Sequence, residues 1–456
     1  MKVAKFGGSS LADAKQIKKV CNIIVSDPER RIIVVSAPGK RFDDDTKVTD
    51  LLILLATACL EKKDGREELK NIIERFSSIA KDLNIIKEMQ STYDNLEKML
   101  TLDKSNPTEF MDTVKATGED TLAKTLATYL QSIGYKAKYV NPGEAGMILT
   151  NEYGNAQLLD ESYERLAQLS ETKEIIIFPG FFGVTLDGKI ATFPRGGSDI
   201  TGAILASAVK ADVYENFTDV DYVYSVSPKI IKSPTPILEA TYREMRELSS
   251  SGFSVYQEEA LRPVYKHGIP VNIRNSNNPN CKGTMIVPEL SKIGEKVIGI
   301  AYDSDFCCIY ITKYLMNREV GFGRKLLKIL EDNNISYEHT PTGIDNISVV
   351  FKQNQLPKEL KADIVSKIYN ELDADDVRVD YNLGMIVLVG EGMANSSTAF
   401  LARATTALSK ADVNIEMISQ GSSKTSMVIA VHESKVKLAM QKLYNEFFDN
   451  NNSTIL

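Results

Sequence analysis

Short apolar runs alternate with amphipathic stretches along the first 295 residues or so of the 456-residue chain. Parallel strands are buried on both faces and read as continuous apolar runs, and the helices that cover them lie between them in sequence. We therefore predict an α/β domain over residues 1–295, with a mainly parallel sheet sandwiched by helices. The predicted strands are Val3–Phe6, Ile32–Val35, Ala137–Val140, Ile175–Phe178, Ile190–Phe193 and Val213–Phe217.

Helices fit between these strands. Ser10 is expected to cap the first helix, whose apolar face has helical spacing and consists of Ile17, Val20, Cys21 and Ile24. Residues 61–102 are highly charged and helix-favouring, with Glu and Lys often four apart. We interpret this stretch as a helical excursion on the solvent side and assign it no chemistry.

The composition excludes several classes of function. With 25% charged residues and a formal charge of −7, the chain is not expected to bind nucleic acid, so any phosphate affinity must be local. No apolar run approaches the ~20 residues that cross a bilayer, and no signal-peptide pattern precedes the first strand, which predicts a cytoplasmic protein without membrane contact. Five cysteines without a C-x-x-C spacing are interpreted as buried thiols, and three scattered histidines form no zinc-ligand pair.

The pattern changes after residue 296, where shorter strand and helix modules repeat. A shift of 78 residues places Glu338 on Glu416 and Gly343 on Gly421, with matching apolar patterns around them. We predict two small, related α+β domains, one over 296–380, which the C-terminal segment could complete, and one over 381–456. The segments 282–284 and 291–296 are the expected linker.

Two glycine-rich segments indicate the chemistry of the first domain. The segment Lys5-Phe6-Gly7-Gly8-Ser9-Ser10 follows the first strand, and Arg195-Gly196-Gly197-Ser198-Asp199 precedes a helix. Glycine lets backbone N–H groups close on phosphate oxygens, and a helix N-terminus favours the same anion. Each segment also carries one cation, Lys5 or Arg195. Either segment alone could be an ordinary strand-to-helix turn, but the pair predicts a phosphate site.

Other polar residues follow predicted strands or begin predicted helices. Ser36 ends a strand in a small-residue turn, where the loops of a parallel sheet usually build a site. Thr49 is expected to cap a helix. Glu119 is expected on the first turn of another helix, where a carboxylate is also favourable simply because that end is positive. Hydroxyls, acids and an aromatic ring that could hold a nucleotide follow the strand Val213–Phe217: Thr218, Asp219, Tyr224 and Lys229.

These segments, in this order, resemble the amino acid kinase family, and within it the aspartokinases, over essentially the whole chain. The paired C-terminal modules resemble ferredoxin-like ACT domains, and the segment 342–348 resembles the monofunctional, lysine-sensitive type. The resemblance rests on Lys5-Phe6-Gly7-Gly8-Ser9-Ser10, Val35-Ser36-Ala37, Val48-Thr49, Gly118-Glu119, Gly180-Phe181-Phe182-Gly183, Arg195-Gly196-Gly197-Ser198-Asp199, Thr218-Asp219-Val220 and Ile273-Arg274-Asn275-Ser276.

The resemblance implies that ATP, with Mg²⁺, phosphorylates the β-carboxylate of L-aspartate to give 4-phospho-L-aspartate, the entry to lysine, threonine and methionine synthesis. It implies catalytic roles for Lys5, Arg195 and Asp199, with Asp199 orienting Lys5. It implies that the substrate is bound by Thr49, Glu119, Phe181, Arg195 and Ser198. It implies that the nucleotide is bound by Lys5, Gly7, Gly8, Ser9, Ser36, Thr218, Asp219, Tyr224 and Lys229.

The chain departs from the family pattern at two places near the nucleotide. Many relatives carry Tyr-x-x-Asp-Pro-Arg where this chain has Tyr224-Ser225-Val226-Ser227-Pro228-Lys229. Relatives also place a lysine that serves the nucleotide where this chain has Ser254. Contacts to ATP are therefore expected to differ in detail from those of the family.

In related lysine-sensitive enzymes the effector lies between ACT modules, so the resemblance implies a lysine site, with or without threonine, in a homodimer or a dimer of dimers. The corresponding positions lie after the first strand of the module and on its second strand: Met316, Glu319, Phe322, Gly323, Ser336, Tyr337 and Glu338. The alternative is that Phe322 and Tyr337 belong to the module core and both glutamates are solvated.

Two other functions remain open at this point. One is another amino acid or carbamate kinase with the same fold. The other is a non-catalytic amino-acid sensor, for which Ser254 is the single supporting feature and against which Lys5, Glu119, Arg195 and Asp199 argue.

Overall fold

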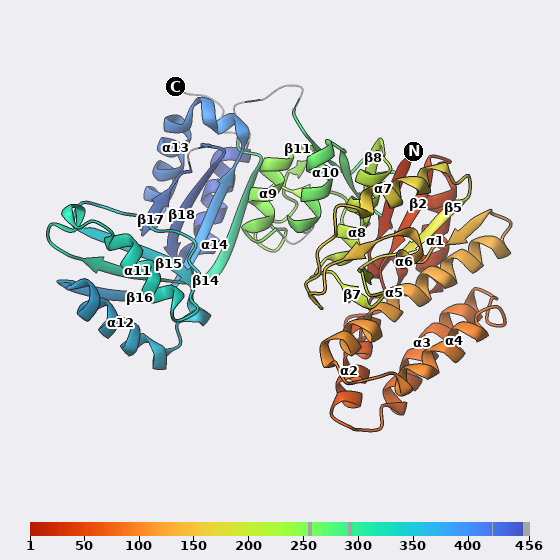
Figure 1. Cartoon of the computed structure of the whole chain (residues 1–456). Helices are drawn as coiled ribbons and strands as arrows, with labels where there is room; N and C mark the ends of the chain where they lie inside the picture. Colours follow the sequence, from red (N-terminus) through yellow and green to blue (C-terminus); the bar gives the residue numbers. More distant parts are fainter. Residues whose placement is uncertain (254–257, 291–293, 295, 422, 450–456) are drawn as a thin grey trace. The chain divides into compact units, whose positions relative to one another are not determined.

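The computed structural model describes residues 1–253, 258–290, 294, 296–421 and 423–449. They form two compact units (Figure 1). The first unit comprises Met1–Val223, Leu238–Tyr242 and Ser254–Leu290, and the second comprises Tyr224–Ile237, Arg243–Phe253 and Ser291–Leu456. The domain boundaries at 295 and 380 stay predictions, and part of the predicted linker, with residues 291–293 and 295, lies outside the described residues.

The first unit is built on an eight-stranded sheet in the order β11-β13-β12-β8-β1-β2-β5-β3. All neighbouring strands are parallel except β12 and β13, which confirms the mainly parallel sheet. The strands are β1 (Lys2–Phe6), β2 (Arg30–Val35), β3 (Ala137–Tyr139), β5 (Ile175–Pro179), β8 (Val213–Thr218), β11 (Glu239–Thr241), β12 (Val271–Asn275) and β13 (Thr284–Val287).

One predicted strand belongs elsewhere. Residues Ile190–Thr192 form β7, which pairs antiparallel with β6 (Phe182–Thr185) in a separate three-stranded sheet that is completed by β4 (Ile148–Leu149). The hairpin turn contains Gly188, whose φ of 75° is readily adopted by glycine. A short apolar run looks the same in the sequence whether it belongs to the large sheet or to the small one. The sequence of residues 190–193 therefore does not show which sheet the strand joins.

Helices cover the large sheet (Figure 1). The prediction that Ser10 caps the first helix is wrong. The cap of α1 is Asp13, whose side chain accepts a hydrogen bond from the Gln16 N–H at 2.8 Å. The helices of this unit are η1 (Gly8–Leu11), α1 (Ala14–Val25), α2 (Val48–Leu60), α3 (Arg66–Asp82), α4 (Gln90–Glu97), η2 (Lys98–Thr101), α5 (Pro107–Ser132), α6 (Pro142–Ala145), α7 (Ser162–Ala167), η3 (Gln168–Glu171), α8 (Gly197–Ala208), η4 (Glu258–Ala260) and α10 (Leu261–His267).

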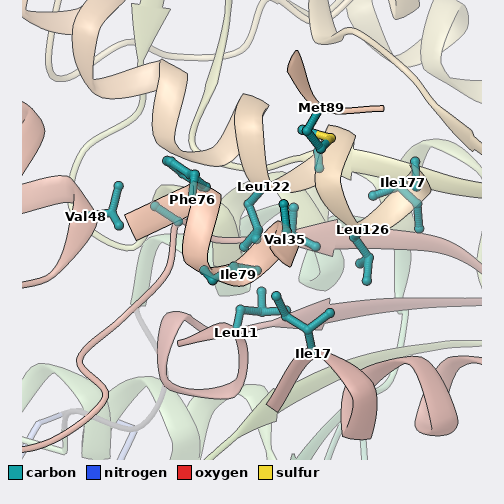
Figure 2. Packing of buried hydrophobic residues seen from close by; sticks show 14 of the residues in the cluster. Leu11, Ile17, Val35, Val48, Phe76, Ile79, Met89, Leu122, Leu126 and Ile177 are labelled. Carbon is teal, nitrogen blue, oxygen red and sulfur yellow. The ribbon is translucent and has the colours of Figure 1, made fainter. Parts of the chain in front are cut away.

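The charged stretch 61–102 is helical as predicted, but it is more than a solvent-side excursion. Phe76 and Ile79 of α3, and Met89 before α4, are buried in the same cluster as Val35 of the sheet and Leu122 of α5 (Figure 2). The charges occupy one side of these helices and apolar residues the other, so the stretch closes the core of the unit.

The second unit is built on one five-stranded sheet in the order β15-β14-β16-β18-β17. The strands β14 and β16 have 14 residues each, and β16 runs through the boundary predicted at 380. Its elements are α9 (Tyr242–Ser250), β14 (Gly299–Thr312), η5 (Met316–Arg318), α11 (Phe322–Glu331), β15 (Asn346–Lys352), η6 (Gln353–Gln355), α12 (Lys358–Leu372), β16 (Asp376–Val389), η7 (Glu391–Asn395), α13 (Ser397–Ser409), β17 (Met417–Ser419), β18 (Ser426–His432) and α14 (Glu433–Phe448), and a small sheet pairs β9 (Val223–Tyr224) with β10 (Pro236–Ile237).

The predicted internal repeat is visible in this unit. The shift of 78 residues carries α11 onto α13, β15 onto β18 and α12 onto α14. Each pair of helices covers its own core, one around Phe351 and Leu326 and the other around Ile429 and Leu443. The two modules are joined because they share β14 and β16, whose ladder shifts register near Asp303.

Two further features concern the whole described chain. Four of the five cysteines are buried, whereas Cys281 is partly exposed. Within the described residues, no helix has the length and apolar character that a membrane span requires.

Candidate active site

The candidate site is centred on an ion pair at the carboxyl end of β1. Lys5 and Asn216 are register partners on the neighbouring strands β1 and β8. Both side chains reach Asp199, in the first turn of α8: Lys5 Nζ lies 2.6 Å from Asp199 Oδ1, and Asn216 donates to the same oxygen at 2.7 Å. Asp199 and Asn216 therefore fix the ammonium group of Lys5 at the carboxyl end of β1, where the glycine turn begins.

The turn after β1 needs glycine because another backbone lies against it. A Cβ on Gly8 would lie 2.8 Å from the Ala37 carbonyl oxygen. Gly7 donates its N–H to the Phe217 carbonyl at 3.1 Å, so this amide is already satisfied by β8. The amides of Gly8 and Ser9 stand at the start of η1, where helix bonding provides no acceptor. The anion-binding capacity of the turn thus rests on Gly8 and Ser9.

The second glycine segment forms the predicted helix N-terminus. Gly196 precedes α8 with a φ of 83°. Ser198 is buried against Gly180, because a Cβ on Gly180 would lie 2.7 Å from the Oγ of Ser198. Arg195 is exposed and has no ion-pair partner within the described part of the chain. Its guanidinium is therefore free to bind an anion beside this helix end.

Phe181 lies beside this helix end in an uncommon backbone conformation. Its φ is 77°, which is rare for a bulky residue, and its N–H donates to Thr201 Oγ1 at 3.0 Å. The Lys115 ammonium lies 5.5 Å from the centre of its ring. Such conformations persist where the surroundings enforce them and are concentrated at functional sites.

Glu119 is the most perturbed acid of the site. It lies in the middle of the 26-residue helix α5 and not in a first turn, so the prediction of its position was wrong and a favourable helix end cannot explain it. The side chain is 5% exposed, and its Oε2 has no hydrogen-bond partner among the residues that the structure describes. Burial raises the pKa of Glu119 to about 8, although backbone hydrogen bonds from Ala37 and from Glu119 itself, and the charge of Lys115, lower it.

Ala37 connects this carboxylate to the glycine turn. Its backbone binds Glu119, and its carbonyl oxygen lies against Gly8. On the same helix, Gly118 allows α5 to approach, because a Cβ there would lie 3.0 Å from the Ala37 side chain. Ala37 therefore contacts both the glycine turn, which can bind phosphate, and a buried carboxylate whose second oxygen lacks a hydrogen-bond partner among the described residues.

The remaining predicted residues of the first unit lie around these groups. Thr49 is half-buried within α2, whose cap is Lys47, so Thr49 is not a helix cap. Ser36 follows β2 and donates its N–H to the Phe6 carbonyl at 3.2 Å. Thr218 ends β8, and its hydroxyl lies 3.2 Å from the exposed Asp219.

Two residues of the site carry no signal that the sequence analysis used. Asn216 holds Asp199 and is placed by its register with Lys5. Lys115 pairs with Asp112 at 2.8 Å and lies over Phe181. Asn216 is the fourth residue of β8, as Lys5 is of β1, so the two positions could be compared from the sequence, whereas the contacts of Lys115 follow from the fold alone.

The other predicted positions belong to the second unit or are not described. Tyr224 and Lys229 lie in the second unit, and Ser254 lies outside the described residues. Met316 and Phe322 are buried in the core around α11, and Gly323 is in α11 with open space beside it.

The polar effector positions differ in their surroundings. Glu319 is held between Lys325 and Lys313 at 2.7 and 3.0 Å, and these two lysines lower its pKa. Ser336, Tyr337 and Glu338 are exposed and precede β15 rather than forming a strand of the sheet. Among these positions, Glu338 offers the carboxylate with no ion-pair partner among the described residues.

Comparison with known proteins agrees with this geometry. The family model of the amino acid kinase family matches residues 1–275, and that of an ACT domain matches residues 386–447. Aspartokinase 3 of Bacillus subtilis is 51% identical over 449 residues, covering 98% of this chain and 99% of its own. The chloroplastic aspartokinase 1 of Arabidopsis thaliana is 30% identical over 463 residues, covering 98% and 80%.

Solved structures give the same result. The aspartate kinase of Clostridium acetobutylicum, described as an allosteric enzyme, superposes with a TM-score of 0.85 at 36% identity and covers 98% of this chain and 99% of its own. Aspartokinase III of E. coli in complex with aspartate and ADP shares the fold, with a TM-score of 0.77 at 23% identity, over 98% of this chain and all of its own.

The chain therefore belongs to the amino acid kinase family, with an ACT domain in its C-terminal part. Within that family it is an aspartate kinase, and it uses ATP as the members of this family do. This result leaves no support for the alternative of a sensor without catalytic activity.

Proposed function

We propose that the enzyme transfers the γ-phosphate of ATP to the β-carboxylate of L-aspartate and forms 4-phospho-L-aspartate. The observation that carries the proposal is the buried Glu119 oxygen without a partner, beside a glycine turn and the Lys5–Asp199 pair. A buried acid in this state is suited to a cationic group of the substrate, and an amino acid supplies one. This reaction is the expected first step of lysine, threonine and methionine synthesis in the cytoplasm.

The chemistry needs positioning and charge neutralisation more than proton transfer. The acceptor carboxylate of aspartate is ionised at pH 7, so the enzyme needs no general base. An anionic acceptor must instead approach a polyanionic donor, which requires fixed cations and N–H groups. In our proposal Lys5, held by Asp199, lies over the transferring phosphate, while Gly8 and Ser9 donate their amides to it. Gly7 contributes by allowing the close approach of the phosphate.

The acceptor is bound by charges at its other end. Glu119 accepts from the ammonium group of aspartate, and the free guanidinium of Arg195 binds its α-carboxylate through a bidentate fork. Hydroxyls and an aromatic ring complete the proposed pocket: Thr49, Ser198 and Phe181. Because both charged ends of the substrate are fixed, its β-carboxylate is left to face the phosphate.

The nucleotide is proposed to lie over the ends of β2 and β8. Its proposed contacts within the first unit are Ser36, Thr218 and Asp219. The described residues bring together no group of three His, Cys, Asp or Glu side chains that could hold a metal. Mg²⁺ prefers phosphate oxygens and water, so we propose that it enters bound to ATP, where it neutralises phosphate charge.

Regulation is proposed to occur through lysine, with or without threonine, bound by ACT modules in a homodimer or a dimer of dimers. The complex of E. coli aspartokinase III with lysine and aspartate motivates this proposal, although at 22% identity its likeness to this chain, with a TM-score of 0.79, concerns the fold. Glu338 is the proposed partner of the lysine ammonium group, because the carboxylate of Glu319 is already held by Lys313 and Lys325.

One assay separates this function from that of another amino acid or carbamate kinase. ADP release is followed by a coupled reaction with aspartate, with glutamate, with carbamate and with no acceptor. We expect ADP release that depends on aspartate. Equal or faster release with another acceptor, or release that needs no acceptor, would contradict the proposal.

A further inference from the structure

One buried arginine lies behind the glycine turn. Arg75 belongs to α3, and its side chain is 5% exposed. Its Nη1 donates to Asp45 Oδ2 at 2.6 Å. Its Nη2 donates to the carbonyl oxygens of Gly39 and Ala12 at 2.7 and 3.1 Å. A single guanidinium group therefore joins α3 to the residue after η1 and to the loop between β2 and α2, which contains both Gly39 and Asp45.

The two carbonyls belong to chain segments on both sides of the turn. Ala12 directly follows η1, which begins at Gly8, and Gly39 donates its N–H to the Gly8 carbonyl at 2.8 Å. A Cβ on Gly39 would lie 2.6 Å from the carbonyl carbon of Gly8, so the two backbones are in direct contact. Because a close-packed interior transmits displacements, a shift of Gly39 or Ala12 moves the Gly8 amide.

Asp45 holds the arginine in place. Arg41 donates to both oxygens of Asp45 at 2.8 Å, and its hydrogen bonds, together with the one from Arg75, keep the pKa of Asp45 well below its usual range. Burial lowers the pKa of Arg75, but a guanidinium group stays protonated in proteins. The planar guanidinium group of Arg75 donates hydrogen bonds in several fixed directions, whereas the ammonium group of a lysine acts as a single point charge.

We infer that Arg75 is a positioning residue that sets the Gly8 and Ser9 amides for phosphate binding. The inference rests on the proposed kinase reaction, and no contact of Arg75 with a substrate is needed. It assigns a role in phosphoryl transfer to the helical stretch 61–102. An arginine that only stabilised the fold would change the unfolding temperature and leave the kinetic constants for ATP unchanged.

The test compares Arg75→Lys with Arg30→Lys in the full-length enzyme. Arg30 is an equally buried arginine that pairs with Glu215 at 2.6 Å, but it begins β2, at the end remote from the site. We expect Arg75→Lys to lower kcat about 10- to 100-fold and to raise KM for ATP, with KM for aspartate changed less than about twofold. Arg30→Lys should leave all three constants close to those of the wild type.

A second variant adds a readout that stability cannot mimic. Guanidinium ion at millimolar concentration should restore part of kcat to Arg75→Ala and none to Lys5→Met. The inference is overturned if folded Arg75→Lys keeps the wild-type kcat and KM for ATP, or if Arg30→Lys causes the same losses. If Arg75→Ala does not fold, Arg75→Lys decides alone.

The failure of the kinase reaction itself would be seen separately. If the wild-type enzyme releases no ADP with aspartate, the proposed function fails, and calorimetry of ADP binding then decides the role of Arg75. Arg75→Lys should weaken ADP binding about tenfold or more, and Arg30→Lys should not. Equal ADP affinity in both variants overturns the inference.

Discussion

Binding of aspartate should release a proton from Glu119. In the ligand-free enzyme burial raises the pKa of this acid to about 8, from a usual value of 4.5. This difference corresponds to about 5 kcal/mol against ionisation, and about nine-tenths of the molecules carry the proton at pH 7. An ammonium group beside the unpartnered Oε2 favours the ionised form, so the proton must leave when aspartate binds.

Calorimetry measures this proton directly. Aspartate is titrated into the wild-type enzyme and into Glu119→Gln at pH 7, in two buffers with different ionisation enthalpies. The wild type should release close to one proton per site, and Glu119→Gln should release none. The apparent affinity of the wild type should rise about tenfold per pH unit below about pH 8 and become constant above it, whereas that of Glu119→Gln should be flat.

The ligand-free protein provides an independent check of the same pKa. A carboxylic acid whose pKa is higher in the folded than in the unfolded state contributes stability that is fully present below about pH 4.5 and is lost as the pH rises through about 8. Glu119→Gln should therefore lose less stability than the wild type between these pH values.

The binding experiment has a refuting outcome. A wild-type binding enthalpy that is the same in both buffers, with an affinity independent of pH, would refute the assignment of Glu119 to the ammonium group.

Three further variants test other parts of the site. Lys5→Met should lower kcat by at least about 10²-fold while the Tm measured by calorimetry stays within a few degrees, because a preorganised cation is lost at the site and not in the core; near wild-type turnover at saturating ATP would remove Lys5 from its role. Glu338→Ala should relieve inhibition by lysine without lowering kcat, measured as the lysine concentration for half inhibition, and unchanged sensitivity would place the effector elsewhere. Ser254→Lys should change KM for ATP but not for aspartate, and a change confined to aspartate would show that this segment is misaligned with the family lysine.

The parallel sheet and the two glycine segments could be predicted from the sequence because their signals are local. The apolar runs of β2 and β5 are continuous, and glycine is needed where backbones touch, as at Gly8. The start of α5 also had a local signal that was not used: Asn106 accepts from the Glu109 N–H and Pro107 opens the helix. Recognising this start would have placed Glu119 in the helix interior.

Other features depend on contacts between distant segments. The run at β7 could have joined either sheet, and its hairpin with β6 decided the outcome. The two modules share β14 and β16, whose ladder shifts register near Asp305 and Asn382, both of which have positive φ. Arg75 resembles any other charge on an amphipathic helix, and only the fold brings it to Asp45 and Gly39.

The central claim is transfer of phosphate to the β-carboxylate of aspartate, and trapping of the acyl phosphate tests it most directly. The enzyme is incubated with ATP, Mg²⁺, aspartate and hydroxylamine, and the aspartyl hydroxamate is identified and quantified by mass spectrometry beside the ADP released. Our account predicts the β-hydroxamate, formed in a one-to-one ratio with ADP and nearly absent with Lys5→Met. Formation of the α-hydroxamate, or ADP release without any hydroxamate, would contradict it.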